Sequence, residues 1–267
     1  MSSRNSLNPF DDHAINRQRH ANVHRPSMDY GAGNIYRPLM DEGADFNSAL
    51  GFRMTALTAP TVEVVASECF LIRDALTVKE QLALSAYIHE RDRTPKNEPR
   101  AMVPAPRTLV LGNDAASPSV SYRRGDASVV NAMVDQSVAL LKREGLSFTR
   151  ITNDIAHYTS LSMATIRYEA PEGRFPPHVD HCRDSAVFLA SLGRSANFMV
   201  RGKGETEVRR FQLRSGDALV FNASTEADLL HGVESIDLAA SDAGEALAEA
   251  FPVFRTHRYG VQCRMYF

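Results

Sequence analysis

The second half of the chain, from Ile151 onward, is divided into short segments of the kind that form β-strands. Six stretches are separated by Gly, Pro, Asn or Ser-Gly-Asp turns: 162–168, 185–193, 197–202, 206–213, 217–222 and 258–267. The Gly-Lys-Gly sequence at 202–204 is a hairpin signal between two of these stretches. Many short strands with turns this close together favour a barrel or a sandwich over alternating strands and helices.

Helices are expected to flank this β region. Thr77 and Glu80 form a capping box, and a helix should follow to about Arg91. A second helix is expected over 127–144, where an apolar stripe runs up to Gly145. Four prolines in the intervening segment predict loops and short strands. The acidic, Ala-rich run at 237–252 is expected to be an inserted loop or short helix. The fold class is therefore α+β, mainly β with flanking helices.

Residues 1–60 differ from the rest of the chain because they are polar and lack apolar periodicity. We expect a disordered or loosely docked tail here, followed by one domain over 61–267. Several arginines before Pro26 raise the possibility of organelle targeting, against which Asp11 and Asp12 argue.

Charge, hydropathy and cysteine content indicate the cellular compartment in which the protein is expected. The net charge of −2 provides no global cationic field. No apolar run approaches the roughly 20 residues needed to span a bilayer. The three cysteines are too scattered for a disulfide scaffold. We expect an intracellular protein, cytoplasmic or nuclear, with no membrane association and no obligate protein partner.

A group of metal-binding side chains follows the expected strands. His178 and Asp180 are two residues apart, so both point to one face of an extended segment. His231 follows about fifty residues later. Two histidines and one carboxylate suit a non-haem iron(II) centre with open coordination positions. A His-x-Asp pair alone is more often a solvated surface pair. The neighbouring His181 and His257 are expected to face away.

The last expected strand carries two arginines. Arg258 and Arg264 are six residues apart, so in an unbulged strand they share one face with Gln262. A guanidinium fork matches a carboxylate in bidentate fashion. We therefore expect one of these arginines to anchor the distal carboxylate of a dicarboxylate cosubstrate beside the metal.

The order of these motifs resembles that of the AlkB-type iron(II)/2-oxoglutarate dioxygenases. The resemblance runs from about Thr61 to the C-terminus, and its core motifs are Arg167-Tyr168, His178-Val179-Asp180, Ser191-Leu192-Gly193, Gly216-Asp217, His231-Gly232, Arg258-Tyr259 and Arg264. It implies a double-stranded β-helix core, a relative of the jelly roll and cupin folds.

The resemblance also implies cofactors and roles. The two histidines and the carboxylate named above would bind Fe(II). Arg258 and Tyr168 would hold the distal carboxylate of 2-oxoglutarate, and Arg264 would lie near cosubstrate and substrate. O2 would be consumed while 2-oxoglutarate loses CO2 to give succinate. An N-methyl group hydroxylated in this way is released as formaldehyde. The expected function is therefore oxidative demethylation of N-alkylated bases in DNA or RNA.

Three positions depart from the family pattern. Ile166 and Gly260 stand where the bacterial enzyme type has asparagines that bind 2-oxoglutarate. Cys182 stands where a second acid helps to read the methylated base. The first two departures remove hydrogen bonds to the cosubstrate. The third keeps open a same-class enzyme acting on a protein side chain, a lipid or a small metabolite. A non-enzymatic, cupin-like binding module is a further alternative.

Candidate substrate contacts lie before the core, in the segment 96–127. Tyr122 could stack a base, and Arg123 and Arg124 could hold phosphates. Together with Cys182 they form the expected substrate-binding set, and nucleic acid is the expected partner. A second basic cluster comprises Arg201, Lys203, Arg209, Arg210 and Arg214, with a solvated face as its simpler explanation.

Overall fold

The computed structural model describes residues 59–93, 107–109, 120–148, 155–239 and 241–267. Residues 1–58 of the predicted tail at 1–60, and most of the predicted substrate segment at 96–127, lie outside this part of the chain. Among the helices in these ranges, none is long and apolar enough to cross a membrane.

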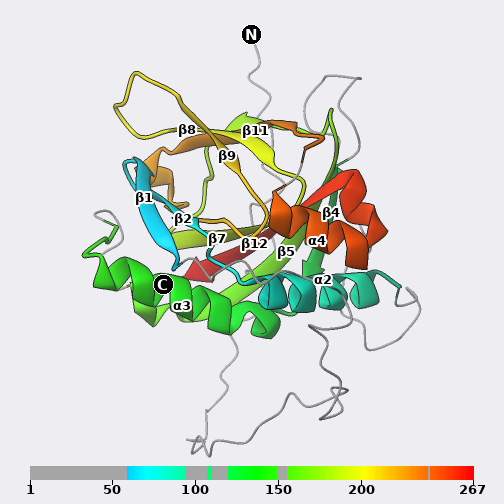
Figure 1. Ribbon diagram of the computed structural model, residues 1–267. Coiled ribbons are helices and arrows are strands. Elements are labelled where there is room, and N and C mark those ends of the chain that lie inside the picture. Colours follow the sequence, from blue (N-terminus) through cyan, green and yellow to red (C-terminus); the bar gives the residue numbers. More distant parts are fainter. Residues whose placement is uncertain (1–58, 94–106, 110–119, 149–154, 240) are drawn as a thin grey trace, which may run out of the picture. The chain divides into compact units, whose positions relative to one another are not determined.

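Two antiparallel sheets face each other (Figure 1). The larger sheet has the strand order β1 (Thr61–Ala66), β2 (Cys69–Arg73), β10 (Ala218–Asn222), β7 (Ser185–Gly193), β12 (His257–Tyr266), β5 (Ser160–Glu169), β4 (Val120–Gly125) and β3 (Arg107–Leu109). The smaller sheet has the order β6 (Phe175–His178), β11 (Leu230–Ile236), β8 (Ala196–Arg201) and β9 (Arg209–Leu213). This is the predicted double-stranded β-helix, and the mainly β class is confirmed.

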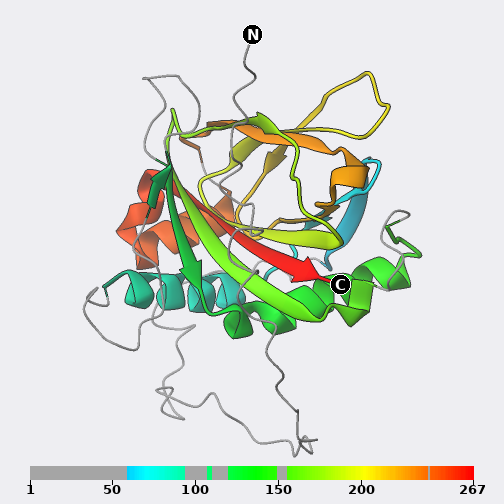
Figure 2. The ribbon, with the colours of Figure 1, turned by 180° about the vertical axis from the view of Figure 1, so that it is seen from behind.

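Helices pack on the outer face of the larger sheet (Figure 2). They are α2 (Val78–Arg93), α3 (Asn131–Arg143) and α4 (Asp242–Ala250), and short 3-10 turns are η3 (Ala127–Val130), η4 (Ile155–His157), η5 (Thr225–Ala227) and η6 (Pro252–Arg255). The predicted capping box is present at α2, where the backbone N–H of Thr77 donates to Glu80 Oε2 at 2.8 Å. The acidic segment at 237–252 contains α4, and η6 begins at its last residue. Leu247 of α4 and Phe254 of η6 are buried in the core.

Alternate residues of strand β12 point to opposite faces of the larger sheet. It pairs along its whole length with β5 and β7 without a register shift. Its odd-numbered residues from Tyr259 to Met265 enter the core beneath the helices. The even-numbered residues from Arg258 to Arg264 consequently face the smaller sheet. The prediction that the two arginines share a face is confirmed.

Strand β11, which carries His231, was not among the six predicted strands. Two features interrupt the alternation of apolar and polar residues by which a strand is recognised in the sequence. Its register with β8 shifts between Val233 and Ser235. Gly232 also interrupts the apolar residues, and a Cβ there would lie 2.8 Å from the carbonyl oxygen of Phe175. Glycine is therefore needed for β6 to approach this closely.

A buried carboxylate fastens the turn before β10 to the end of β2. Asp217 is fully buried and accepts a hydrogen bond at 2.7 Å from Arg73 Nη1. It also accepts the backbone N–H groups of Asp74 at 3.2 Å and Arg214 at 2.9 Å. A carboxylate with this many donors holds two distant segments of the chain in register.

We expect Asp217→Ala to lower the free energy of unfolding by about 3 kcal/mol, because the donors would lose their buried acceptor. Urea denaturation would measure the change. Arg210→Ala is the matched control, because it breaks the exposed 3.0 Å ion pair with Glu234 and should cost less than about 1 kcal/mol. Equal losses in the two variants would contradict a structural role for Asp217.

Candidate metal and cosubstrate site

The three predicted metal ligands meet between the two sheets. His178 ends β6, and its Cα is the register partner of His231 on β11. The ligand atoms of His178, Asp180 and His231 all lie within 4.8 Å of one another. One detail of the prediction is wrong: Asp180 does not share a strand with His178, because β6 ends at His178. The carboxylate arrives from the following loop instead and is 3% exposed.

Backbone carbonyls orient both imidazole rings. Nδ1 of His178 lies 3.0 Å from the carbonyl oxygen of Pro176, and Nδ1 of His231 lies 3.1 Å from that of Leu229. A carbonyl oxygen only accepts, so in both rings Nδ1 carries the proton. Each Nε2 then presents a lone pair, which is the form of histidine that binds a metal.

The carboxylate of Asp180 is held from one side. Its Oδ2 accepts a hydrogen bond from Arg264 Nη2 at 2.7 Å. Its Oδ1 is buried and has no hydrogen-bond partner among the described residues. Oδ1 also lies 3.6 Å from His178 Nε2, which is too long for a hydrogen bond. An unpartnered buried oxygen beside two imidazole lone pairs fits a cation.

The charge state of the group suits a divalent ion. Burial alone would raise the pKa of Asp180, but the Arg264 guanidinium and the two histidines hold it well below its usual range. Burial, together with the charge of His178, lowers the pKa of His231 to about 4. At neutral pH His231 is therefore a neutral ligand and Asp180 an ionised one, as metal binding requires.

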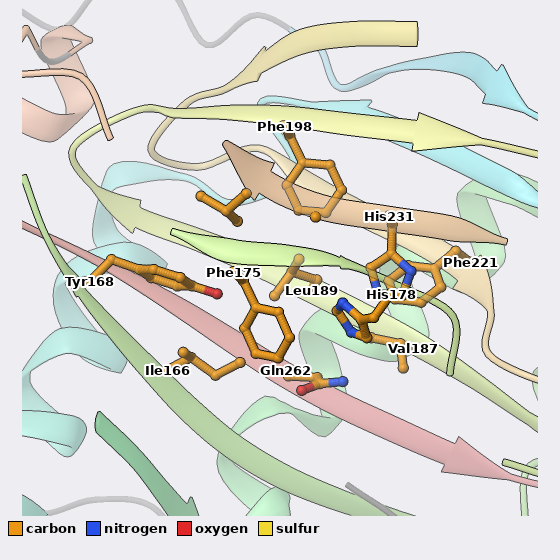
Figure 3. A pocket seen from close by; sticks show the side chains of 12 residues that line it. Ile166, Tyr168, Phe175, His178, Val187, Leu189, Phe198, Phe221, His231 and Gln262 are labelled. Carbon is orange, nitrogen blue, oxygen red and sulfur yellow. The ribbon is translucent and has the colours of Figure 1, made fainter. Parts of the chain in front are cut away.

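Aromatic rings pack around the histidines (Figure 3). The ring centroids of Phe175 and His178 are 4.4 Å apart, and those of Phe221 and His231 are 4.7 Å apart. The centroids of the two imidazole rings are also 4.4 Å apart. This packing restricts the rotation of both rings and surrounds the ligand atoms with apolar groups.

An apolar cavity of about 390 Å³, including its open mouth, adjoins the histidines. Its lining residues are Ile166, Tyr168, Phe175, His178, Val187, Leu189, Phe198, Phe221, His231, Gly232, Val233 and Gln262. The tyrosine and glutamine side chains bring polar groups to a wall that is otherwise apolar apart from the histidines. Such a wall excludes water around whatever the cavity holds.

Arg258 is the largest fully buried side chain in the described part of the chain. Its guanidinium carbon lies 5.2 Å from the ring centre of Tyr168, and the two residues are register partners on β12 and β5. None of its three guanidinium nitrogens has a hydrogen-bond partner within the described residues. Burial lowers the pKa of Arg258, while Tyr168 opposes that shift. A buried cation with free donors fits an anionic ligand such as a carboxylate.

The second arginine of β12 contacts one of the three candidate metal ligands. Nη2 of Arg264 contacts Asp180, and Nη1 lies 3.3 Å from Ser185 Oγ. Its charge is therefore used to hold a carboxylate of the protein. The sequence showed that Arg264 faces the site, but not that it binds Asp180, because their contact depends on a loop whose path was unknown.

The positions that depart from the family pattern remove polar groups from the cavity. Ile166 contributes an apolar side chain to its wall. Gly260 leaves room for the anchor, because a Cβ there would lie 3.0 Å from Arg258 Nη1. Cys182 is half-buried, and its backbone bridges to Ser224. His257 contacts Arg167 at 2.9 Å and Thr256 at 2.8 Å, away from the three ligand atoms.

The predicted substrate residues are described only in part. Tyr122, Arg123 and Arg124 lie on β4, paired with Ile166, Thr165 and Ala164 of β5. Their side chains lie outside the described atoms. In the second basic cluster, Arg210 pairs with Glu234 and Arg214 with Asp217. Two of the five basic side chains in this cluster are therefore paired with carboxylates.

A family model described as the 2OG-Fe(II) oxygenase superfamily matches residues 69–264. The chain belongs to this superfamily. It is an iron(II)- and 2-oxoglutarate-dependent dioxygenase, and Fe(II), 2-oxoglutarate and O2 are its cofactors and cosubstrates. This membership excludes the alternative of a non-enzymatic binding module.

A solved structure supports the fold. The structure of OsALKBH1 is 16% identical, with a TM-score of 0.55 over 77% of this chain and 100% of that chain. A prolyl-4-hydroxylase of Pseudomonas putida is 12% identical, with a TM-score of 0.47 over 75% of this chain and 94% of that chain. No curated protein sequence matches. The predicted likeness to AlkB-type dioxygenases is confirmed for the fold.

The metal-free protein should lose stability as the pH falls from 6.5 to 4. Above pH 6.5 His231 is neutral in both folded and unfolded states, so its contribution is complete. Below pH 6.5 His231 becomes protonated in the unfolded chain. In the folded protein the buried ring stays neutral down to its pKa of about 4. The loss should approach about 3 kcal/mol by pH 4. Asp180 adds nothing in this window, because its pKa shift acts at lower pH.

Urea denaturation at several pH values, in the presence of a chelator, would measure this loss. His231→Gln should flatten the decline. His257→Gln is the control, because burial also lowers the pKa of His257. This variant measures how much of the stability loss comes from His257 and not from His231. An undiminished decline in His231→Gln would contradict the burial of a neutral His231.

Proposed function

We propose that this dioxygenase removes N-alkyl groups oxidatively from bases in DNA or RNA. The observation that carries the oxygenase chemistry is the arrangement of the site. Three metal-ligand side chains lie together, two of them on the wall of an apolar cavity, and an unpartnered buried arginine packs against Tyr168 of the same wall. The base-demethylating role is supported by the order of the AlkB-type motifs and by the fold shared with OsALKBH1.

In the proposed site His178, Asp180 and His231 hold the iron. The metal supplies the activation of O2 that is coupled to decarboxylation of 2-oxoglutarate. Arg264 acts on the metal ligand by binding Oδ2 of Asp180, which turns Oδ1 toward the two Nε2 atoms. The carbonyl groups behind both histidines would hold the rings with Nε2 free to bind the metal.

Arg258 holds the distal carboxylate of 2-oxoglutarate in this proposal. Its free donors and full burial give it a charge that an incoming carboxylate would neutralise. The hydroxyl of Tyr168 is a second donor, since burial raises its pKa to about 12 and keeps it protonated. The apolar walls between anchor and metal pack against the methylene groups of the cosubstrate and exclude water.

The substrate is proposed to enter beside β4. The backbone register places Tyr122 opposite Ile166, which lines the cavity. Tyr122 would stack a base, while Arg123 and Arg124 would bind phosphates of the same strand. Cys182, two residues after Asp180, would lie next to the reacting group.

Cys182 also favours a second candidate substrate class. A thiol is a poor acceptor for the amino group of a base, and the family uses an acid at this position. The same centre could then hydroxylate a protein side chain, a lipid or a small metabolite. The two candidates share the iron and 2-oxoglutarate chemistry and differ only in the substrate.

A panel of oligonucleotides carrying different N-methylated bases would test the proposal. We expect formaldehyde release from at least one of them that depends on iron and 2-oxoglutarate. His178→Ala should abolish it, together with uncoupled succinate formation, because the metal loses a ligand. Robust uncoupled succinate formation without turnover of any methylated base would instead favour the second substrate class.

Arg258→Ala should raise the concentration of 2-oxoglutarate needed for half-maximal succinate formation. Losing a buried, charged contact typically costs about 2–5 kcal/mol, which corresponds to an increase of at least roughly 30-fold. Arg210→Ala makes the same change on the exposed surface and should leave the requirement unaltered. An equal requirement in both variants would show that Arg258 does not anchor the cosubstrate.

A further inference from the structure

Gln262 occupies the floor of the cavity between the two arginines of β12. It lines the cavity, and its side-chain amide lies below Phe175 and His178 in the view of Figure 3. Its register partners are Ala164 on β5 and Leu189 on β7, whose side chains are apolar. The side chains of both strand neighbours therefore offer the amide no hydrogen bond.

The side chain of Gln262 is half-buried and makes no hydrogen bond to any other residue that the structure describes. Its neighbours on the same face of β12 differ in this respect. Arg264 is paired with Asp180. Gly260 has no side chain, and the Arg258 guanidinium lies close to it instead. A polar group left free among apolar walls is usually satisfied by a ligand or by water.

The position of Gln262 along β12 decides which part of a ligand it meets. The distal carboxylate would lie at the level of Gly260, where Nη1 of Arg258 lies. One same-face step along a strand covers roughly 6.7 Å. Gln262 is one such step nearer to Arg264 and Asp180. A five-carbon dicarboxylate anchored on Arg258 would therefore present its metal-facing end to Gln262.

We propose that the side-chain amide N–H of Gln262 donates a hydrogen bond to the keto-acid end of 2-oxoglutarate. This rests on the proposed position of the distal carboxylate at Arg258. Gln262 thereby supplies a polar contact in a pocket where Ile166 and Gly260 supply none. A neutral amide serves here because it binds an anion without competing as an anionic ligand for the metal.

Calorimetric titration of the full-length, Mn(II)-loaded protein tests this without turnover. Two ligands are compared: 2-oxoglutarate and succinate, which retains a distal carboxylate but lacks the keto-acid end. Gln262→Met keeps the length of the side chain and removes its hydrogen bonds. It should raise the Kd for 2-oxoglutarate about tenfold and leave the Kd for succinate unchanged.

Three further variants make the result specific. Gln262→Glu keeps the shape but places a negative charge beside the ligand, so it should weaken 2-oxoglutarate more than Gln262→Met does. Gln212→Met makes the same replacement on the exposed face of β9 and should change neither Kd. Arg258→Lys should weaken both ligands, because it loses the guanidinium fork. Thermal midpoints would establish that each variant is folded.

The outcomes separate this proposal from the preceding one. If Gln262→Met leaves both Kd values unchanged, or raises both equally, the keto-acid contact is wrong. If Gln262→Met is unfolded, Gln262→Glu decides in its place, and an unaltered Kd for 2-oxoglutarate overturns the contact. If Arg258→Lys changes neither Kd, the anchor itself is wrong. Failure of the oligonucleotide panel would bear on the substrate and not on Gln262.

Discussion

The uninterrupted pairing of β12 with β5 and β7 is the constraint on which the site depends. Because no bulge shifts the register, each residue of β12 has a fixed face. One face enters the core beneath α2 and α3, and the other forms the floor of the cavity. A single residue inserted before Val261 would exchange the two faces and place Val261 where Gln262 now lies. The chemistry of the cavity is thus a consequence of strand register.

The even-numbered face of β12 carries two buried cations in different electrostatic situations. Arg264 is compensated by Asp180 at 2.7 Å, and it stabilises that ligand in its ionised form. Arg258 has no such compensation among the described residues. The fold therefore bears the cost of one unpaired charge until an anion arrives. This difference explains how one strand can serve both the metal and the cosubstrate.

Much of the site could be predicted from the sequence, because local periodicity determines it. The strands carrying Arg258 and Tyr168 have clear patterns, and the histidines and carboxylate occur in a recognisable order. The contact between Arg264 and Asp180 could not be predicted, because it joins a loop and a strand that are distant in sequence. Strand β11 was hidden by Gly232 and by its irregular register. The first failure concerns packing between elements, and the second concerns a strand whose local pattern is interrupted.

Strand β6 is the edge of the smaller sheet, has four residues and contains two prolines. Prolines donate no hydrogen bonds, so the attachment of β6 to β11 has few of them and a break in register. Local opening of the protein should consequently start at β6 rather than in the long strands of the larger sheet. Since His178 ends β6, local opening of this strand would also let the metal ion enter and leave the site. An ion bridging β6 and β11 would in turn act as a clasp that suppresses the fraying.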